Sequence, residues 1–208
     1  LGKPQGTLQK SKYDEYKVLM NKIITAIKED RIYPVYQPIF SNLENKVVKY
    51  EALARLKTIE GKELTPYMFL DIAKKNNQYS EITKSIVKKS LEYFNNNTFG
   101  ISINLSLMDI TNIDTVNFII NEVDKFSNPK RISFEILEDE SIKNYNLLIS
   151  FVDEVKALGC KVAIDDFGSG YSNFEHLLKM NIDYLKIDAS LIKNIATNEN
   201  SYKITKTI

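Results

Sequence analysis

The sequence has few of the features that mark secreted or membrane proteins. Cys160 is the only cysteine, so no internal disulfide can form, which fits a reducing compartment. No run of about 18 apolar residues is available for a membrane span. The polar residues 1–12 also lack the apolar core of a secretory signal. We therefore expect a soluble cytoplasmic domain without direct membrane contact.

The sequence also lacks an excess of charge of either sign. Lys and Arg total 28 against 27 Asp and Glu, a net charge of +1. Bulk electrostatic attraction to DNA, RNA or an anionic membrane is therefore not expected. Any phosphate group must instead be bound by a local arrangement of side chains.

The length of 208 residues is sufficient for one domain with its own core. Residues 1–31 are predicted to be a lead-in and a helix, because Tyr16, Met20, Ile23 and Ile27 follow the spacing of one helical face. Residues 32–208 are predicted to be the main domain.

Short apolar runs alternate with helical patterns along the main domain. Strands are predicted at 33–40, 46–53, 99–106, 131–137, 160–165 and 183–188. Helical patterns begin at Thr65-Pro66 and continue within 82–94, 116–123, 147–158 and 174–178. This alternation predicts parallel strands joined by crossover helices. An open doubly wound sheet and a closed β/α barrel both satisfy it.

The two faces of each predicted strand distinguish these folds, because successive strand side chains point to opposite faces. In the strand at 131–137, Ile132, Phe134 and Ile136 oppose Ser133 and Glu135. The strands at 46–53, 99–106, 160–165 and 183–188 divide similarly. An open sheet covered on both sides needs apolar residues on both faces, whereas a barrel needs helices only outside. The sequence therefore predicts an α/β fold of the TIM-type barrel class.

Polar side chains at the strand ends form a predicted rim. The residues are Glu51, Asn104, Glu135, Asp165 and Lys186. Three converging carboxylates would repel one another unless a cation compensates them. Ligands that are all oxygen atoms favour Mg²⁺ or Mn²⁺. Asp166 is placed to help hold a second ion, and two such ions can activate water and stabilise a leaving oxygen.

Six motifs in the chain resemble, in order, the signature of EAL domains, the cyclic di-GMP phosphodiesterases. They lie at 36–39 (YQPI), 50–55 (YEALAR), 104–106 (NLS), 134–138 (FEILE), 165–172 (DDFGSGYS) and 185–188 (LKID). The resemblance implies a modified β/α barrel whose first strand is antiparallel. It also implies hydrolysis of cyclic di-GMP to linear pGpG.

The resemblance also implies roles for individual residues. Glu51, Asn104, Glu135 and Asp165 match ligands of one metal ion and Asp166 a ligand of the second. Lys186 matches a lysine near the attacking water, and Glu138 matches a glutamate that braces the loop at 167–171. Gln37 and Arg55 match substrate contacts. A homodimer and an attached GGDEF or sensory domain are further implied partners.

For three of these residues, a structural role is the alternative to a role in the site. Lys186 could neutralise Asp188 or a rim carboxylate, Glu138 could belong to a solvated acidic patch, and Arg55 could be a surface charge.

The chain departs from the family pattern at its end. The family continues with a seventh strand that carries a glutamate and with an eighth strand, whereas the printed chain ends within the helix expected after the sixth strand. We therefore expect a barrel truncated before its last two strands, in a natural chain that continues. A partner chain or a rearrangement covering the gap is the alternative.

Two other functions are compatible with the residues. A catalytically inactive domain could bind cyclic di-GMP as a receptor, which the missing glutamate favours and the intact DDFG and EAL positions disfavour. Another metal-dependent barrel enzyme, such as one that abstracts a proton beside a carboxylate, would need a second base, which the sequence does not identify.

Overall fold

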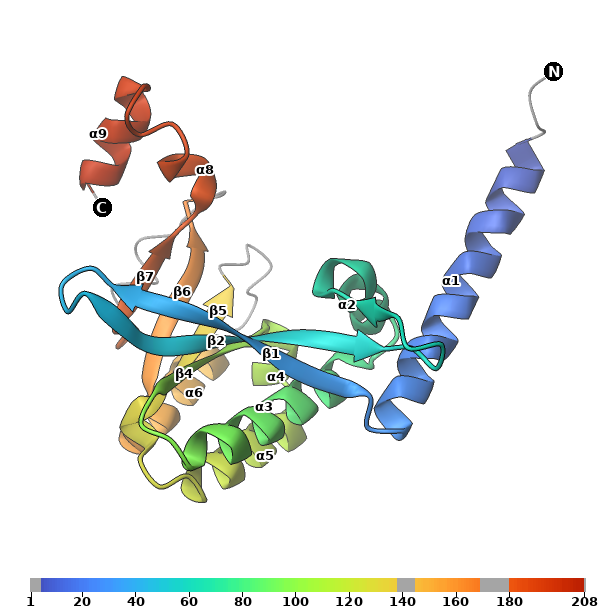
Figure 1. Cartoon of the computed structure of the whole chain (residues 1–208), viewed down its shortest axis with the longest axis horizontal. Helices are drawn as coiled ribbons and strands as arrows, with labels where there is room; N and C mark the ends of the chain where they lie inside the picture. The colour runs from blue at the N-terminus through green and yellow to red at the C-terminus, as the bar shows by residue number, and fades with distance from the viewer. Residues whose placement is uncertain (1–4, 138–144, 169–179, 208) are drawn as a thin grey trace.

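The fold is organised around one mixed sheet. The computed structural model describes residues 5–137, 145–168 and 180–207 (Figure 1). The six longer strands pair in the order β1-β2-β4-β5-β6-β7, and the short strand β3 pairs with β2. Their bounds are β1 Ile32–Ser41, β2 Lys46–Lys57, β3 Glu63–Leu64, β4 Gly100–Leu105, β5 Ile132–Leu137, β6 Lys161–Phe167 and β7 Tyr184–Ile187.

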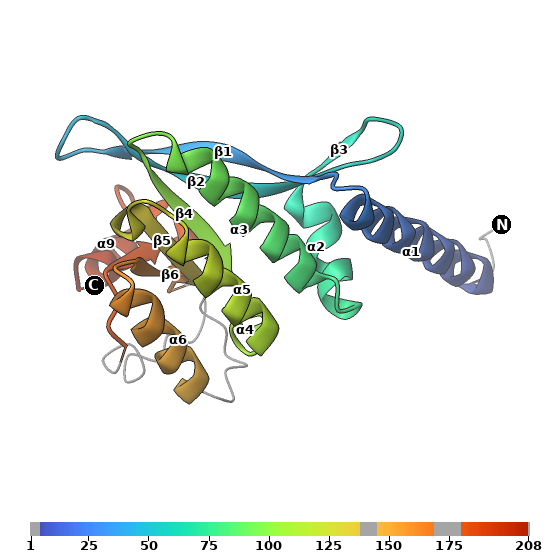
Figure 2. The same ribbon diagram turned by 90° about the horizontal axis from the view of Figure 1, so that it is seen from below.

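Helices precede, connect and follow the strands, and some of them cover one side of the sheet. They are α1 Gln5–Lys28, α2 Pro66–Lys75, α3 Tyr79–Asn95, α4 Leu107–Ile110, α5 Ile113–Asp124, α6 Tyr145–Ala157, α8 Ala189–Ile192 and α9 Glu199–Thr207, with a 3₁₀ turn at Pro129–Arg131. Figure 2 shows α3, α5 and α6 on the same side of the sheet. Helix α1 extends away from the body of the domain (Figures 1 and 2).

The antiparallel first strand is confirmed. β1 and β2 form a hairpin in which Gln37 lies opposite Glu51, whereas β2-β4, β4-β5, β5-β6 and β6-β7 are all parallel. β1 and β7 stand at the two ends of the strand order, so the sheet of the described residues is not closed into a barrel. This open arrangement agrees with the predicted absence of two final strands.

The predicted division into two faces is confirmed on β5, whereas Leu185 on β7, predicted for the apolar face, is 38% exposed. Ile132, Phe134 and Ile136 on β5 are at most 1% exposed, and the Phe134 ring packs edge-on against Phe151 of α6 with centroids 6.0 Å apart. The core therefore lies between this face of the sheet and the helices. The opposite face is left for polar side chains such as Glu135.

Several elements differ from the prediction or were not predicted. Strand β3 and helices α4 and α8 are only two to four residues long, and such short elements have too little periodicity to be recognised. The helical pattern at 174–178 lies outside the described residues. Helix α2 begins at Pro66, as predicted, and α6 ends just before Gly159, whose φ of +97° favours glycine.

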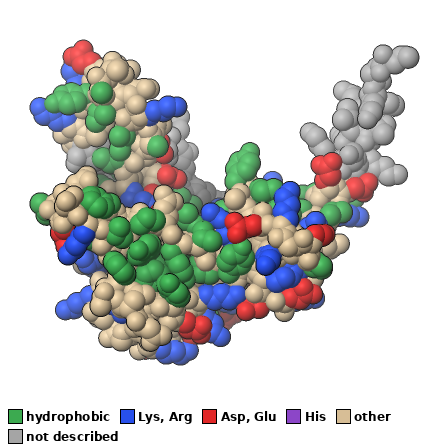
Figure 3. Space-filling model, in the orientation of Figure 1, with side chains coloured by type: hydrophobic (Ala, Val, Ile, Leu, Met, Phe, Trp, Pro, Cys, Tyr) green, Lys and Arg blue, Asp and Glu red, His purple; other side chains and the backbone are tan. Residues whose placement is uncertain are grey.

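The surface in Figure 3 shows basic and acidic side chains intermixed on the visible face. This distribution matches the small net charge. Among the described helices, none is long and apolar enough to cross a bilayer.

Cys160 should be protected from thiol reagents in the folded protein. Its side chain is buried, and burial raises the pKa of the thiol to about 12. Because the thiolate is the reactive form, we expect negligible reaction with a thiol-specific reagent at pH 8 under native conditions. One equivalent should react in urea, and rapid labelling of the native protein would contradict this packing.

Candidate metal centre

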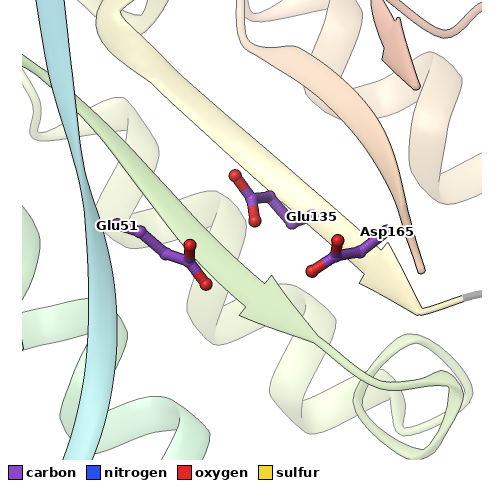
Figure 4. Close-up of side chains that lie close together, drawn as sticks. All are labelled: Glu51, Glu135 and Asp165. Carbon is purple, nitrogen blue, oxygen red and sulfur yellow. The ribbon is translucent and has the colours of Figure 1, made fainter. Parts of the chain in front are cut away.

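Three carboxylates from separate strands converge on the polar face of the sheet. Glu51 of β2, Glu135 of β5 and Asp165 of β6 each place one oxygen so that the three atoms lie within 4.8 Å of one another. Figure 4 shows these side chains pointing toward a common space. The predicted convergence of Glu51, Glu135 and Asp165 is therefore present in the structure.

The register of the parallel strands produces this convergence. Glu51 pairs with Ser102 on β4, and Asn104, two residues further along, pairs with Glu135 on β5. The side chains of Glu51, Asn104 and Glu135 consequently occupy adjacent positions on one face. The Asn104 amide Nδ2 donates a hydrogen bond to Glu51 Oε1 at 2.8 Å, which holds Glu51 toward the centre.

An irregularity in β6 lies beside Asp165 and Asp166 and explains why these adjacent side chains are placed differently. Ile164 pairs with Leu185 and Phe167 with Ile187, so β6 advances three residues while β7 advances two. Such a bulge re-aims the side chains next to it. Asp166 takes a φ of +55° and is exposed, and its backbone N–H donates to Asp165 Oδ1 at 2.9 Å. Although Asp166 is exposed, partial desolvation and the negative charges of Asp165 and Asp188 raise its pKa.

Lys186 lies among the three carboxylates. Its Nζ donates to Glu135 Oε2 and, at 2.7 Å, to Asp165 Oδ2, and it lies 3.6 Å from Glu51 Oε2. Burial alone would lower the pKa of Lys186, but the hydrogen bonds to Asp165 and Glu135 and the attraction of the acidic groups raise it overall. Lys186 therefore neutralises rim carboxylates. Asp188, the other acidic group considered for it, caps α8 by accepting from the Ser190 N–H.

The acidic side chains fit a divalent cation. Glu135 is fully buried, and its Oε1 has no hydrogen-bond partner among the described residues. An unpaired buried carboxylate oxygen is costly, and coordination to a cation would satisfy it. The donor set contains only oxygen atoms, which suits hard ions. Glu51, Glu135 and Asp165 could therefore hold a metal ion.

The remaining predicted residues are placed differently. Gln37 is exposed on β1 directly opposite Glu51. Arg55 lies four residues beyond Glu51 on β2, where its Nε is 3.4 Å from Glu63 Oε1 and its guanidinium also donates to the Ala54 carbonyl. Glu138 lies outside the described residues.

Lys49 is a further polar residue of this face, and no role was predicted for it from the sequence. It precedes Glu51 by two residues and lines a pocket of about 670 Å³ with Glu51, Glu135 and Lys186. Its ammonium lies 4.9 Å from the centroid of the Tyr184 ring, and burial lowers the pKa of Lys49. The two-residue spacing from Glu51 was the signal that could have identified it.

Sequence comparison connects the chain to a known family. The profile of the EAL domain matches residues 20–208. The chain is 31% identical to cyclic di-GMP phosphodiesterase PdeB of Shewanella oneidensis over 90% of its own length and 23% of that protein. It is also 31% identical to cyclic di-GMP phosphodiesterase PdeA of Borreliella burgdorferi, over 97% of the chain and 32% of that protein. The chain thus spans less than a third of the length of either relative.

Solved structures share the fold. An EAL domain protein from Listeria monocytogenes superposes with a TM-score of 0.79 at 28% identity, covering 90% of this chain and 75% of that one. The EAL enzyme Bd1971, in a form bound to cAMP and cyclic di-GMP, gives a TM-score of 0.84 at 25% identity, covering 94% of this chain and 56% of that one.

The family profile spans both the sheet and the segments that carry Glu51, Glu135 and Asp165. Sequence, fold and the placement of these acidic residues agree, and the chain belongs to the EAL domain family.

Proposed function

We propose that this domain hydrolyses one phosphodiester bond of cyclic di-GMP to give linear pGpG, with Mg²⁺ or Mn²⁺ as cofactor. The observation that carries the proposal is the meeting of Glu51, Glu135 and Asp165 around the unpartnered, buried Glu135 Oε1. The names of the sequence relatives supply the substrate and reaction class.

Each side chain has a definite part in this proposal. Glu51, Asn104, Glu135 and Asp165 would hold one ion and Asp166 a second, and bound ions would supply activated water and stabilise the leaving oxygen. Asn104 orients Glu51 through its amide. For Asn104 to act as a ligand as well, its side-chain oxygen would face the ion while Nδ2 keeps the bond to Glu51.

The other proposed roles concern the substrate. Lys186 is in reach of the same space and would donate to a phosphate oxygen or to the attacking water. Gln37 stands beside Glu51 and would contact the substrate. Arg55 would leave Glu63 to bind a phosphate, for which its planar guanidinium is suited. Glu138 would brace the loop at 167–171.

The proposed activity is tested by incubating the protein that contains this domain with cyclic di-GMP and Mg²⁺, Mn²⁺ or EDTA. We expect linear pGpG with either metal and none with EDTA, as measured by chromatography of the nucleotides. Tight binding of cyclic di-GMP without product under every metal condition would show a receptor and refute the proposal.

Replacement of Glu51 by alanine should remove metal binding and turnover together. The change deletes one carboxylate of the cluster and the acceptor of the Asn104 amide. Calorimetric Mn²⁺ titration and product formation are the two measurements. Glu92→Ala on the exposed surface of α3 is the control and should leave both unchanged. A Glu51→Ala protein that still binds Mn²⁺ and turns over cyclic di-GMP would show that Glu51 is not a metal ligand.

A further inference from the structure

We infer that Lys186 is a built-in counter-cation that competes with the divalent ion for the same carboxylates, so that metal binding must displace its ammonium group. The inference rests on the proposed function, because it concerns regulation of the same site. It assigns Lys186 a role in setting metal affinity, in addition to its proposed contact with substrate.

The geometry places the ammonium where a cation would bind. Lys186 Nζ contacts Glu135 Oε2 and Asp165 Oδ2 and lies 3.6 Å from Glu51 Oε2. These are the same three carboxylates whose oxygen atoms lie within 4.8 Å of one another. Their side chains are only 0%, 15% and 18% exposed for Glu135, Asp165 and Glu51. Two cations cannot share so small a space without strong repulsion.

Lys186 is also the one basic side chain of the described residues that forms an ion pair with this cluster. Lys49, which lines the same pocket, lies over the ring of Tyr184. Lys161 donates to the Tyr184 hydroxyl at 2.8 Å. Lys49 is attracted to Glu135 at longer range, but the ion pairs with the cluster within the described part of the chain come from Lys186.

The side chain has space to move. Lys186 is 33% exposed, and it lines the pocket of about 670 Å³ that lies along the polar face of the sheet. A flexible four-carbon stem allows its ammonium to leave the carboxylates while staying in this pocket. Metal loading would then release Lys186 for contact with a phosphate oxygen, which couples occupancy of the metal centre to availability of the lysine.

Lys186→Met removes the competing charge while keeping a long apolar stem. We expect this variant to bind Mn²⁺ roughly tenfold more tightly or better than the wild type, because a unit charge a few ångströms from the ion is lost. Free Mn²⁺ is measured by electron paramagnetic resonance during titration. Lys161→Met is the matched control, because Lys161 lines the same pocket but donates to the Tyr184 hydroxyl. This variant should bind Mn²⁺ with the affinity of the wild type.

Equal or weaker Mn²⁺ binding by Lys186→Met than by the wild type would overturn the inference while leaving the metal centre intact. Absence of Mn²⁺ binding in the wild type and both variants would instead refute the metal centre of the proposed function. Lys186→Gln also removes the charge and should bind Mn²⁺ more tightly than the wild type. Lys186→Arg keeps the charge and should bind Mn²⁺ no more tightly than the wild type. The Gln variant replaces the Met variant if the latter does not fold.

Thermal unfolding gives a second, independent readout. In EDTA, Lys186→Gln should unfold at a lower temperature than the wild type, because three carboxylates then face one another without a counter-charge. Saturating Mn²⁺ should raise the midpoint more in Lys186→Gln than in the wild type, in proportion to the tighter binding. Equal rises in the two proteins would contradict the exchange of ammonium for metal.

Discussion

Replacement of Glu135 by glutamine is expected to weaken Mn²⁺ binding by at least about a hundredfold, because even residues that only orient metal ligands contribute ten- to a hundredfold. The side chain keeps its size but loses the charge at the centre of the cluster. Glu135 is fully buried and its Oε1 has no partner within the described residues. Turnover of cyclic di-GMP should fall in parallel and recover in part at high Mn²⁺ concentration.

The matched control is Glu122→Gln on α5. Glu122 is also a buried glutamate, at 9% exposure, but it pairs with Lys125 and is not part of the acidic cluster. This variant should bind Mn²⁺ as the wild type does. If Glu135→Gln bound Mn²⁺ with unchanged affinity, Glu135 would not be a ligand.

Replacement of Phe134 by alanine should strongly lower the free energy of unfolding. Phe134 is fully buried on the helix-facing side of β5 and packs against Phe151. Truncation of a buried phenylalanine typically costs about 3–5 kcal/mol, a large share of the 5–15 kcal/mol that stabilises an ordinary domain. Urea unfolding followed by circular dichroism measures the difference.

Phe40→Ala provides the comparison for that substitution. Phe40 lies on β1 and is 53% exposed, so its loss should change the free energy of unfolding by about 0.5 kcal/mol or less, as for most surface substitutions. A loss below about 1 kcal/mol for Phe134→Ala would show that the core does not lie where the packing of β5 on α6 places it.

The central part of the site could be predicted from the sequence because it depends on strand parity. Alternation of Ile132, Phe134 and Ile136 with Ser133 and Glu135 fixes which side of β5 faces the helices, and the contact of Phe134 with Phe151 of α6 confirms it. The same logic on the strands before and after β5 placed Asn104 and Asp165 on the polar face, and Asn104 pairs with Glu135 in the sheet.

Other features depend on information that alternation does not contain. The pattern of strands and helices predicts parallel pairing, so the antiparallel β1 could be expected only from the resemblance to EAL domains. The bulge on β6 arises because β6 advances three residues while β7 advances two. It depends on pairing between distant segments, so no local pattern around Asp165 and Asp166 reveals it.

Contacts between particular side chains could likewise not be predicted from the sequence. Parity placed Lys186 on the polar face but could not tell whether its ammonium would meet Asp188 or the rim carboxylates. The structure shows contact with Glu135 and Asp165. Arg55 was predicted to contact substrate, yet its guanidinium lies beside Glu63, which belongs to a two-residue strand that the sequence pattern did not predict.

The most direct test of the account is a crystal of the protein soaked in Mn²⁺ and measured near the manganese absorption edge. We expect an anomalous difference peak bounded by Glu51, Glu135 and Asp165, with the Lys186 ammonium moved away from these carboxylates. A well-ordered site without such a peak, with Lys186 still bonded to Glu135 and Asp165 at saturating Mn²⁺, would contradict it.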